Sequence, residues 1–214
     1  MWRQLRPAVS SVLVFTALFG LVFPFAITAL ARTLFPRQAA GSLVSRDGHV
    51  IGSSLIAQGF TAPGYFHPRP SAAGSGYDGG ASGGTNLGPT SAKLVNGIHN
   101  KLPNGQDDPG NFDGIRDLVA AYRTENGLAA NAPVPADAVT RSGSGLDPDI
   151  SPANAMLQSS RVAHARGVQE DSVKAVVTRH TELRQFGILG EPRVNVLELN
   201  LDLDRCFPTA EPRR

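Results

Sequence analysis

The sequence has little of two residue types, and each shortage excludes a class of site or partner. Among its 214 residues Cys206 is the single cysteine, so no internal disulfide and no cluster of thiolate metal ligands can form. Only three lysines occur. Residues 1–37 carry four arginines and no acid, which leaves residues 38–214 with 16 basic and 18 acidic groups, a net charge of −2. A nucleic-acid-binding domain shows a basic stripe, so no nucleic-acid partner is expected.

The motifs of common catalytic sites are also absent. No G-x-x-x-x-G-K-[ST] loop is present to hold a nucleotide phosphate. The segment Arg141–Gly145 lacks the first glycine of G-x-S-x-G and is interpreted as a turn. None of the five histidines pairs with another at i, i+3 or i, i+4, so we expect no metal site. Asp147 and Asp149, on either side of Pro148, are either paired carboxylates or a turn capped by side chains; no catalytic residue is assigned.

The longest feature that is present is an uncharged run of 24 residues, 8–31. As a helix it spans roughly 36 Å, enough to cross a hydrocarbon core of about 30 Å with some tilt. A helix at the surface of a soluble core would have a polar face, and this run has none. Pro24 removes one backbone donor and is expected to kink the helix, which membrane helices tolerate. We therefore predict a single transmembrane helix.

A secretory signal peptide is the rival interpretation. Residues 29–31, Ala-Leu-Ala, fit a small-x-small cleavage site, and Arg3 and Arg6 fit a charged leader. The apolar run is longer than the 7–15 residues of a signal peptide, which favours a retained anchor. The arginines before and after the run are too similar in number to decide its orientation.

Four residues of this run recur every fourth position and share one face of the helix. A face this small lets a second helix approach closely. It either packs on a partner helix or faces lipid. The four residues are Thr16, Gly20, Pro24 and Thr28.

The remainder of the chain is expected to form one α/β (α+β) domain. The predicted organisation is a short tail (1–7), the transmembrane helix (8–31), a linker (32–41), the soluble domain (42–207) and a C-terminal tail (208–214). Asp47-Gly48 predicts a type I′ hairpin within 42–56. The glycine-rich stretch 58–89 contains four aromatic residues, so an ordered irregular loop is expected, with Arg69 and Asp78 able to pair inside it.

Hydrophobic periodicity predicts the regular elements that follow. Ser151 as N-cap and Gly167 as C′ residue bound one of the helices. Leu197, Leu199, Leu201 and Leu203 alternate and predict a half-buried strand, although Val194 and Val196 lie in the opposite phase, so a bulge or a short terminal helix stays open. The predicted helices are 91–102, 113–125, 152–166 and 169–183, and the predicted strand is 193–203.

Four segments together resemble a known family. This family is the KdpC subunits of bacterial potassium-transporting P-type ATPases, and the N-terminal anchor of this chain matches it as well. The resemblance covers nearly the whole chain. The segments are YFHPRPSA (65–72), ASGGTNLGPT (81–90), VTRSGSGLDPDISP (139–152) and GEPRVNVLELN (190–200).

The resemblance implies a non-catalytic accessory subunit of an ATP-driven, high-affinity potassium pump. The family is anchored in the cell membrane by one helix, with its N-terminus in the cytoplasm and its domain outside. Its implied partners are a channel-like potassium-binding subunit and an ATP-hydrolysing P-type subunit. The family is described as raising the ATP affinity of the pump, so ATP belongs to the complex. The sequence agrees in lacking the Asp-Lys-Thr-Gly phosphorylation loop.

One residue carries the implied link to ATP. A glutamine matching Gln158 has been tied to that role in the family, whereas the residue alone is more often a solvent-facing helix position. A domain outside the membrane cannot touch cytoplasmic nucleotide, so the effect would then pass through the partner subunits. The alternative functions are a membrane-anchored hydrolase using Asp147 or Asp149, and a secreted binding protein if the chain is cleaved after Ala31.

Overall fold

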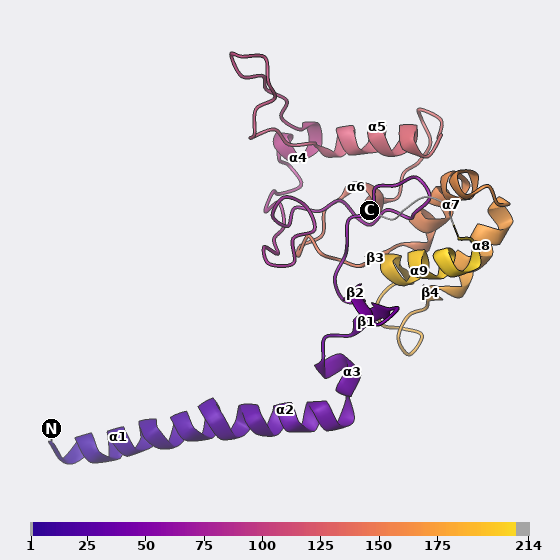
Figure 1. Cartoon of the computed structure of the whole chain (residues 1–214). Coiled ribbons are helices and arrows are strands. Elements are labelled where there is room, and N and C mark those ends of the chain that lie inside the picture. The colour runs from indigo at the N-terminus through magenta and orange to yellow at the C-terminus, as the bar shows by residue number, and fades with distance from the viewer. Residues whose placement is uncertain (1, 209–214) are drawn as a thin grey trace. The chain divides into compact units, whose positions relative to one another are not determined.

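The structure, a computed structural model, describes residues 2–208 and divides into two units that meet between Ser53 and Ser54. Figure 1 shows the long N-terminal helix of the first unit and the mixed helices and short strands of the second. The first unit holds α1 (Trp2–Ala17), the π-helical turn η1 (Leu18–Val22), α2 (Phe23–Leu34), α3 (Pro36–Ala39), β1 (Leu43–Arg46) and β2 (His49–Ser53).

The predicted apolar helix is present and is longer than the sequence suggested. The helices α1, η1 and α2 run without a break over 33 residues, Trp2–Leu34. An 18-residue stretch of this helix has a mean hydropathy of 2.3, and none of the helix is buried. Residues 2–7, expected to be a tail, form its first turns. It continues past Ala31 to Leu34 and ends at Phe35 (φ −134°), because a residue before proline is disfavoured in the helical region. Its length and composition suffice to cross a membrane.

The disturbance expected at Pro24 takes the form of a wide turn. In η1 the Phe23 N–H donates to the Leu18 carbonyl, five residues back instead of four. The wide turn ends just before Pro24, whose ring would otherwise meet the carbonyl of Gly20. A Cβ added to Gly20 would meet only Thr16 Cγ2, at 3.9 Å, so the helix itself has room for a side chain there.

The predicted hairpin at Asp47-Gly48 is confirmed. Arg46 pairs with His49 across an antiparallel ladder, with one irregularity between Val44 and Ser45. Asp47 (φ 51°) and Gly48 (φ 80°) both adopt the positive φ that a type I′ turn requires.

The second unit is a mixed helix and strand domain, as expected. Its three short strands form one antiparallel sheet in the order β3-β5-β4. The elements are α4 (Ala92–Asn96), α5 (Ile115–Glu125), α6 (Ala136–Val139), β3 (Asp149–Ile150), α7 (Pro152–Arg166), α8 (Glu170–Arg179), β4 (Thr181–Glu182), β5 (Arg193–Asn195) and α9 (Val196–Cys206).

The end of this unit corrects the predicted strand over 193–203. Only Arg193–Asn195 is a strand, and α9, the terminal helix that the sequence left open as the alternative, follows at once. Asn195 begins the helix, because its side chain accepts a hydrogen bond from the Glu198 N–H. The alternating leucines do not mark a strand here, because polar residues occupy the other buried positions of a helical period. The buried positions of α9 are Val196, Leu197, Leu199, Asn200, Leu203 and Asp204.

The predicted α7 is confirmed at both ends, and α8 in its position and buried face. Ser151 accepts from the Asn154 N–H, and Gly167 closes α7 in the left-handed conformation (φ 64°, ψ 32°). On α8, Val173, Val176 and Val177 are buried as predicted, although this helix ends at Arg179 instead of 183. The other two predicted helices agree with the structure to different extents. Residues 91–102 are helical only in α4, because Gly97 (φ 78°) ends it and Ile98 pairs with Phe112 instead, while α5 lies within the predicted 113–125.

The glycine-rich stretch 58–89 is ordered, as its aromatic residues predicted. Phe66 and Ala73 are fully buried, and Phe66 belongs to the main core with residues of α7, α8 and α9. The predicted Arg69–Asp78 pair is wrong. Arg69 instead forms an ion pair with Asp147 at 2.8 Å, because the loop folds back on residues 140–152. In the same region Ser71 donates to the Gly145 carbonyl at 2.6 Å.

Two glycines test how closely these loops pack. Gly145 and Gly127 share a positive φ (68° and 63°), but a Cβ on Gly145 would lie 2.5 Å from the Gly83 carbonyl oxygen, and one on Gly127 would meet nothing within 4 Å. We expect Gly127→Ala to lower the free energy of unfolding by about 1 kcal/mol. Gly145→Ala should cost roughly 2 kcal/mol more, because backbone must shift. Urea unfolding of the full chain in detergent measures both, and equal losses would contradict the close packing.

Candidate functional site

Gln158 is buried in the centre of the second unit. It lies on α7 and is 1% exposed, so the expectation of a solvent-facing residue is wrong. Its side-chain oxygen accepts from the His67 N–H at 2.8 Å and from Arg161 Nη2 at 2.7 Å. Its amide nitrogen donates to the His67 carbonyl at 3.1 Å and to Asn154 Oδ1 at 2.9 Å. Two donors and two acceptor sites are all that a carboxamide has, so its hydrogen-bonding capacity is fully used by the protein.

A second carboxamide repeats this arrangement on the neighbouring residue. Asn200 of α9 accepts from the Phe66 N–H at 2.8 Å and donates to the Phe66 carbonyl at 2.9 Å. Gln158 and Asn200 thus replace a neighbouring strand for Phe66 and His67, whose polar backbone groups would otherwise lack partners inside the unit. We call Gln158 and Asn200 the amide pair. It attaches the irregular loop to α7 and α9.

The amide pair is held by further buried polar groups. Asn154 Oδ1 also accepts from the Tyr122 hydroxyl at 2.8 Å, and its amide nitrogen donates to Asp137 at 3.0 Å. Burial is the main reason that the pKa of Tyr122 is raised, so the phenol stays a neutral donor. No buried side-chain nitrogen or oxygen between residues 2 and 208 lacks a hydrogen-bond partner. The network therefore connects α5, α6 and α7 without an unsatisfied group.

Arg161 is the cation of this network. Besides Gln158 it donates to the carbonyls of Pro63 (2.7 Å) and Tyr65 (2.9 Å) and to Asn126 Oδ1 (3.1 Å). Burial lowers its pKa, but a guanidinium remains charged at any physiological pH. Two of these four hydrogen bonds hold the loop segment that precedes His67.

The His67 side chain adds an ion pair to the attachment made by its backbone. Its Nδ1 lies 2.7 Å from Glu125 Oε1, and its Nε2 lies 3.1 Å from the Ala62 carbonyl oxygen. Both neighbours are acceptors, so only the doubly protonated ring donates to both. The hydrogen bond from His67 is the largest reason that the pKa of Glu125 is lowered.

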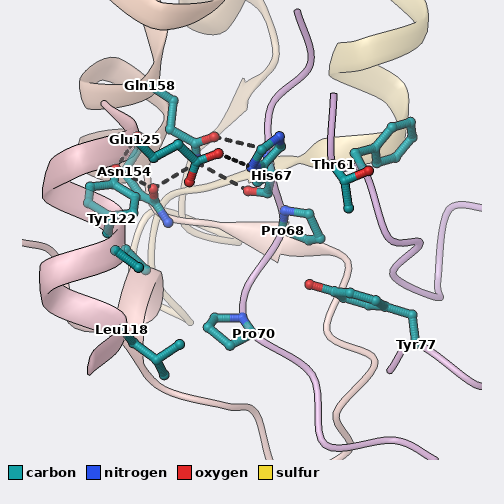
Figure 2. Close-up of a pocket in the computed structure, with 13 residues that line it drawn as sticks. Thr61, His67, Pro68, Pro70, Tyr77, Leu118, Tyr122, Glu125, Asn154 and Gln158 are labelled. Carbon is teal, nitrogen blue, oxygen red and sulfur yellow. Dashed lines mark hydrogen bonds and ion pairs between the residues drawn. The ribbon is translucent and has the colours of Figure 1, made fainter. Parts of the chain in front are cut away.

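These groups form one wall of a pocket of about 250 Å³ (Figure 2). In Figure 2, Gln158, Glu125 and Asn154 come from the helices, while His67, Pro68 and Pro70 come from the loop. Neither lysine nor arginine lines the pocket, and its one acid is Glu125, so it lacks the cations that bind a phosphate chain. Its lining residues are Phe60, Thr61, His67, Pro68, Pro70, Tyr77, Leu118, Ala121, Tyr122, Glu125, Ala138, Asn154 and Gln158.

The two aspartates considered for acid–base chemistry each form an ion pair with a different arginine. Asp147 pairs with Arg69 and accepts from the Asp149 N–H at 3.1 Å, which is the capped turn that the sequence allowed. Asp149 pairs with Arg193 at 3.1 Å. Burial, the largest influence, raises the pKa of Asp149. Neither carboxylate is linked to a nucleophile, so the hydrolase alternative gains no support.

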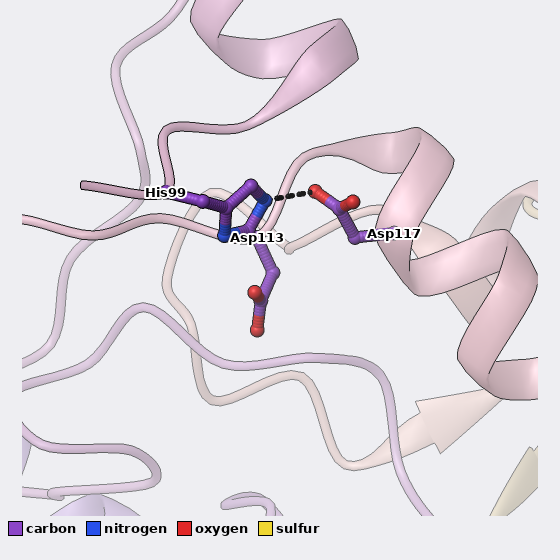
Figure 3. Close-up of side chains that lie close together, drawn as sticks. All are labelled: His99, Asp113 and Asp117. Carbon is purple, nitrogen blue, oxygen red and sulfur yellow. Dashed lines mark hydrogen bonds and ion pairs between the residues drawn. The ribbon is translucent and has the colours of Figure 1, made fainter. Parts of the chain in front are cut away.

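A third group of titratable side chains lies outside the pocket. One ligand atom each from His99, Asp113 and Asp117 lies within 4.8 Å of the others, and Figure 3 shows the ring facing Asp117. His99 Nε2 is 2.9 Å from Asp117 Oδ2, which also accepts from the Gly114 N–H at the start of α5. These two bonds lower the pKa of Asp117. Helix capping therefore accounts for the position of Asp117 and for its contact with His99. Sequence spacing could not reveal this cluster.

Sequence reasoning missed most of the residues around Gln158. Asn154 and Gln158 are four residues apart on α7, and both are 1% exposed. Asn200 falls at a buried position of α9. The available signal was polar residues at positions where helical periodicity predicts burial, but the helix over 196–206 was not the favoured prediction.

Comparison with known proteins matches this chain over nearly its full length. The family model described as "KdpC: K+-transporting ATPase, c chain" matches residues 5–205. The chain belongs to the KdpC family. Each relative below is named a potassium-transporting ATPase KdpC subunit, and the match covers all of each relative. They come from Koribacter versatilis (49% identical, 100% of this chain), Mycobacterium tuberculosis H37Rv (51%, 96%) and Rhodospirillum rubrum (50%, 98%).

The lowered pKa of Glu125 predicts how the His67–Glu125 pair responds to acid. A carboxylate whose pKa is lowered by folding stabilises the fold above its unfolded pKa, near 4.3, and this contribution is lost as the pH falls through the folded value. Glu125→Gln should lower the free energy of unfolding by about 0.5–1 kcal/mol near pH 6, allowing for solvent screening. The difference from the parent should shrink below the unfolded pKa and vanish as the pH falls through the lowered folded pKa.

Urea unfolding of the full chain at several pH values makes this measurement. Glu182→Gln, which removes a carboxylate from the exposed pair with Arg193, is the matched control for the loss of one negative charge. A Glu125→Gln deficit that stays constant down to pH 3 would show that the carboxylate does not act through its charge.

Proposed function

We propose that this chain is the accessory, non-catalytic subunit of an ATP-driven potassium uptake pump, and that it raises the ATP affinity of the catalytic subunit. The observation that carries the proposal is the KdpC family match over residues 5–205, which includes both the apolar helix and the amide pair. The proposed partners are the ATP-hydrolysing P-type subunit and the channel-like potassium-binding subunit. ATP is bound at the level of the complex.

We further propose that the helix Trp2–Leu34 anchors the chain once in the cell membrane, in contact with lipid. It holds the uncharged run 8–31, and none of its residues is buried. Following the family, the N-terminus is placed in the cytoplasm and the second unit outside.

The surroundings of Gln158 support an indirect effect on ATP. All four of its hydrogen bonds are made to the protein, and three of their partners are His67 and Asn154 atoms inside the same unit. A glutamine without a free donor or acceptor is a positioning residue. We propose that it fixes the loop over 60–70, which docks on the partner subunits and transmits a coupling free energy of typically about 1–3 kcal/mol to the nucleotide site.

The helix face Thr16, Gly20, Pro24 and Thr28 is the proposed contact with a partner helix. The wide turn η1 lies between Thr16 and Pro24. Four residues exceed one turn of an α-helix, so a face built on this spacing drifts around the axis, and a wider turn counteracts the drift.

Replacing Gln158 tests the indirect effect. In the assembled pump, Gln158→Ala should weaken the apparent ATP affinity about fivefold or more, because the His67 backbone loses both of its partners. Ser159→Ala is the matched control: Ser159 is also fully buried on α7, but its hydroxyl bonds only to the Ala155 carbonyl of its own helix. The ATP dependence of hydrolysis is measured for both variants.

Topology is measured in the same variants. A cysteine at the exposed position Ser172, in a Cys206→Ser background, should react with a membrane-impermeant thiol reagent in whole cells. External labelling together with weakened ATP affinity supports indirect coupling. Labelling only after lysis would overturn the topology and favour direct contact, and unchanged ATP dependence would remove Gln158 from the mechanism.

Replacing Gly20 tests the helix face. Gly20→Leu adds bulk that the helix itself can accommodate, so insertion should be normal while a partner helix is pushed away. The pump purified in detergent should then lose this subunit. Leu18→Phe, outside the four-residue face, is the control and should co-purify normally; normal co-purification of Gly20→Leu would refute the face.

A further inference from the structure

We propose that the loop between β4 and β5 inserts its tip into the surface of the lipid bilayer. This proposal rests on the membrane anchoring proposed above. The loop projects beyond the small sheet of the second unit (Figure 1). We call its four apolar residues the apolar tip: Leu183, Phe186, Ile188 and Leu189.

The apolar tip is the main exposed apolar surface of the second unit. Its side chains are 76%, 91%, 75% and 54% exposed, in chain order. Within residues 54–208 the other exposed large hydrophobic residues are Leu55 (60%) and Ile56 (40%). Clustered apolar exposure of this kind marks a contact surface, unlike single exposed leucines.

The backbone of the loop pairs most of its N–H groups within the loop itself. An N–H without a partner is costly in a lipid environment, because hydrocarbon supplies no acceptor. Gln185 and Leu189 exchange two N–H···O bonds of 2.9 Å each. The Gly187 N–H donates to the Arg184 carbonyl, and the Ile188 N–H to the Gln185 carbonyl. Over residues 185–189 only the N–H of Phe186 lies outside these bonds, while the carbonyls of residues 186–188 are left to the water and headgroups of the bilayer surface.

Phe186 stands where an aromatic residue is disfavoured. Its φ of 53° lies in the left-handed region, which glycine or asparagine adopts with less strain. The ring is nevertheless 91% exposed, so packing inside the unit does not compensate for the strain. Strain kept without an internal contact indicates that the ring acts outside the fold.

The charges at the base of the loop match the polar boundary of a bilayer. Arg184 pairs with Glu191 at 2.7 Å, and Arg193 pairs with Glu182 at 2.6 Å. No charged residue lies between Gln185 and Gly190. The base therefore carries no net charge, and insertion should need no anionic lipid.

The connection to the anchor is short enough for the loop to reach lipid. Only eight residues lie between Leu34 and Leu43, at most about 30 Å of extended chain. The hairpin then pairs Leu43 with Ser53, so it adds little length before the second unit starts. A domain of this size is about 40 Å across, from a radius of gyration near 15 Å. The unit is thus held within about its own diameter of the membrane.

Tryptophan fluorescence in vesicles tests the proposal. Trp2 is the only tryptophan, so Phe186→Trp in a Trp2→Phe background reports on the tip alone. Asn104→Trp in the same background is the matched control, at the exposed polar turn Leu102–Gln106 of the same unit. The full chain is reconstituted in neutral phosphatidylcholine vesicles with and without brominated acyl chains.

We expect the Phe186→Trp emission to shift to the blue and to be quenched by brominated lipid, while the Asn104→Trp emission stays red-shifted and unquenched. A chain that floats with the vesicles but gives equal emission from both positions overturns the insertion and leaves the anchoring intact. A chain that does not float overturns both. In the assembled pump, a blue shift without quenching would assign the tip to a protein partner and overturn the lipid proposal.

Discussion

The second unit depends on how two buried amides satisfy an irregular backbone. The segment Phe66–His67 runs through the core without a strand beside it, yet its peptide groups are fully paired, because Gln158 and Asn200 each offer a donor and an acceptor. Leaving one such buried group unpaired costs about 1–3 kcal/mol, so the four bonds together decide whether the loop is part of the fold. The helices α7 and α9 are in turn held to one another through this loop.

Local sequence signals predicted the elements whose causes are local. Ser151 and Gly167 determine the ends of α7, Asp47-Gly48 determines the hairpin, and a run without charge determines the long helix. These signals depend on residues close together in the chain, so they can be recognised from the sequence alone. The family resemblance, too, was visible in the sequence and is confirmed.

The predictions that failed involve partners distant in the chain. Arg69 was paired with the nearby Asp78 but binds Asp147, and the leucines of 197–203 were assigned to a strand because the burial of Asn200 against Phe66 was not visible. Gln158 was interpreted as solvent-facing for the same reason: its partner His67 is 91 residues away. A polar residue looks like a surface residue until the backbone group that it satisfies is known.

The amide pair also has a consequence for how this protein tolerates change. The bonds from Gln158 and Asn200 to the loop reach only backbone atoms of residues 66 and 67, and every residue other than proline offers the same N–H and C=O. The identity of the side chain at position 67 is therefore uncoupled from the attachment of the loop and is left to its ion pair with Glu125. A substitution at position 67 can therefore change the side chain that the loop presents without removing the hydrogen bonds from the amide pair.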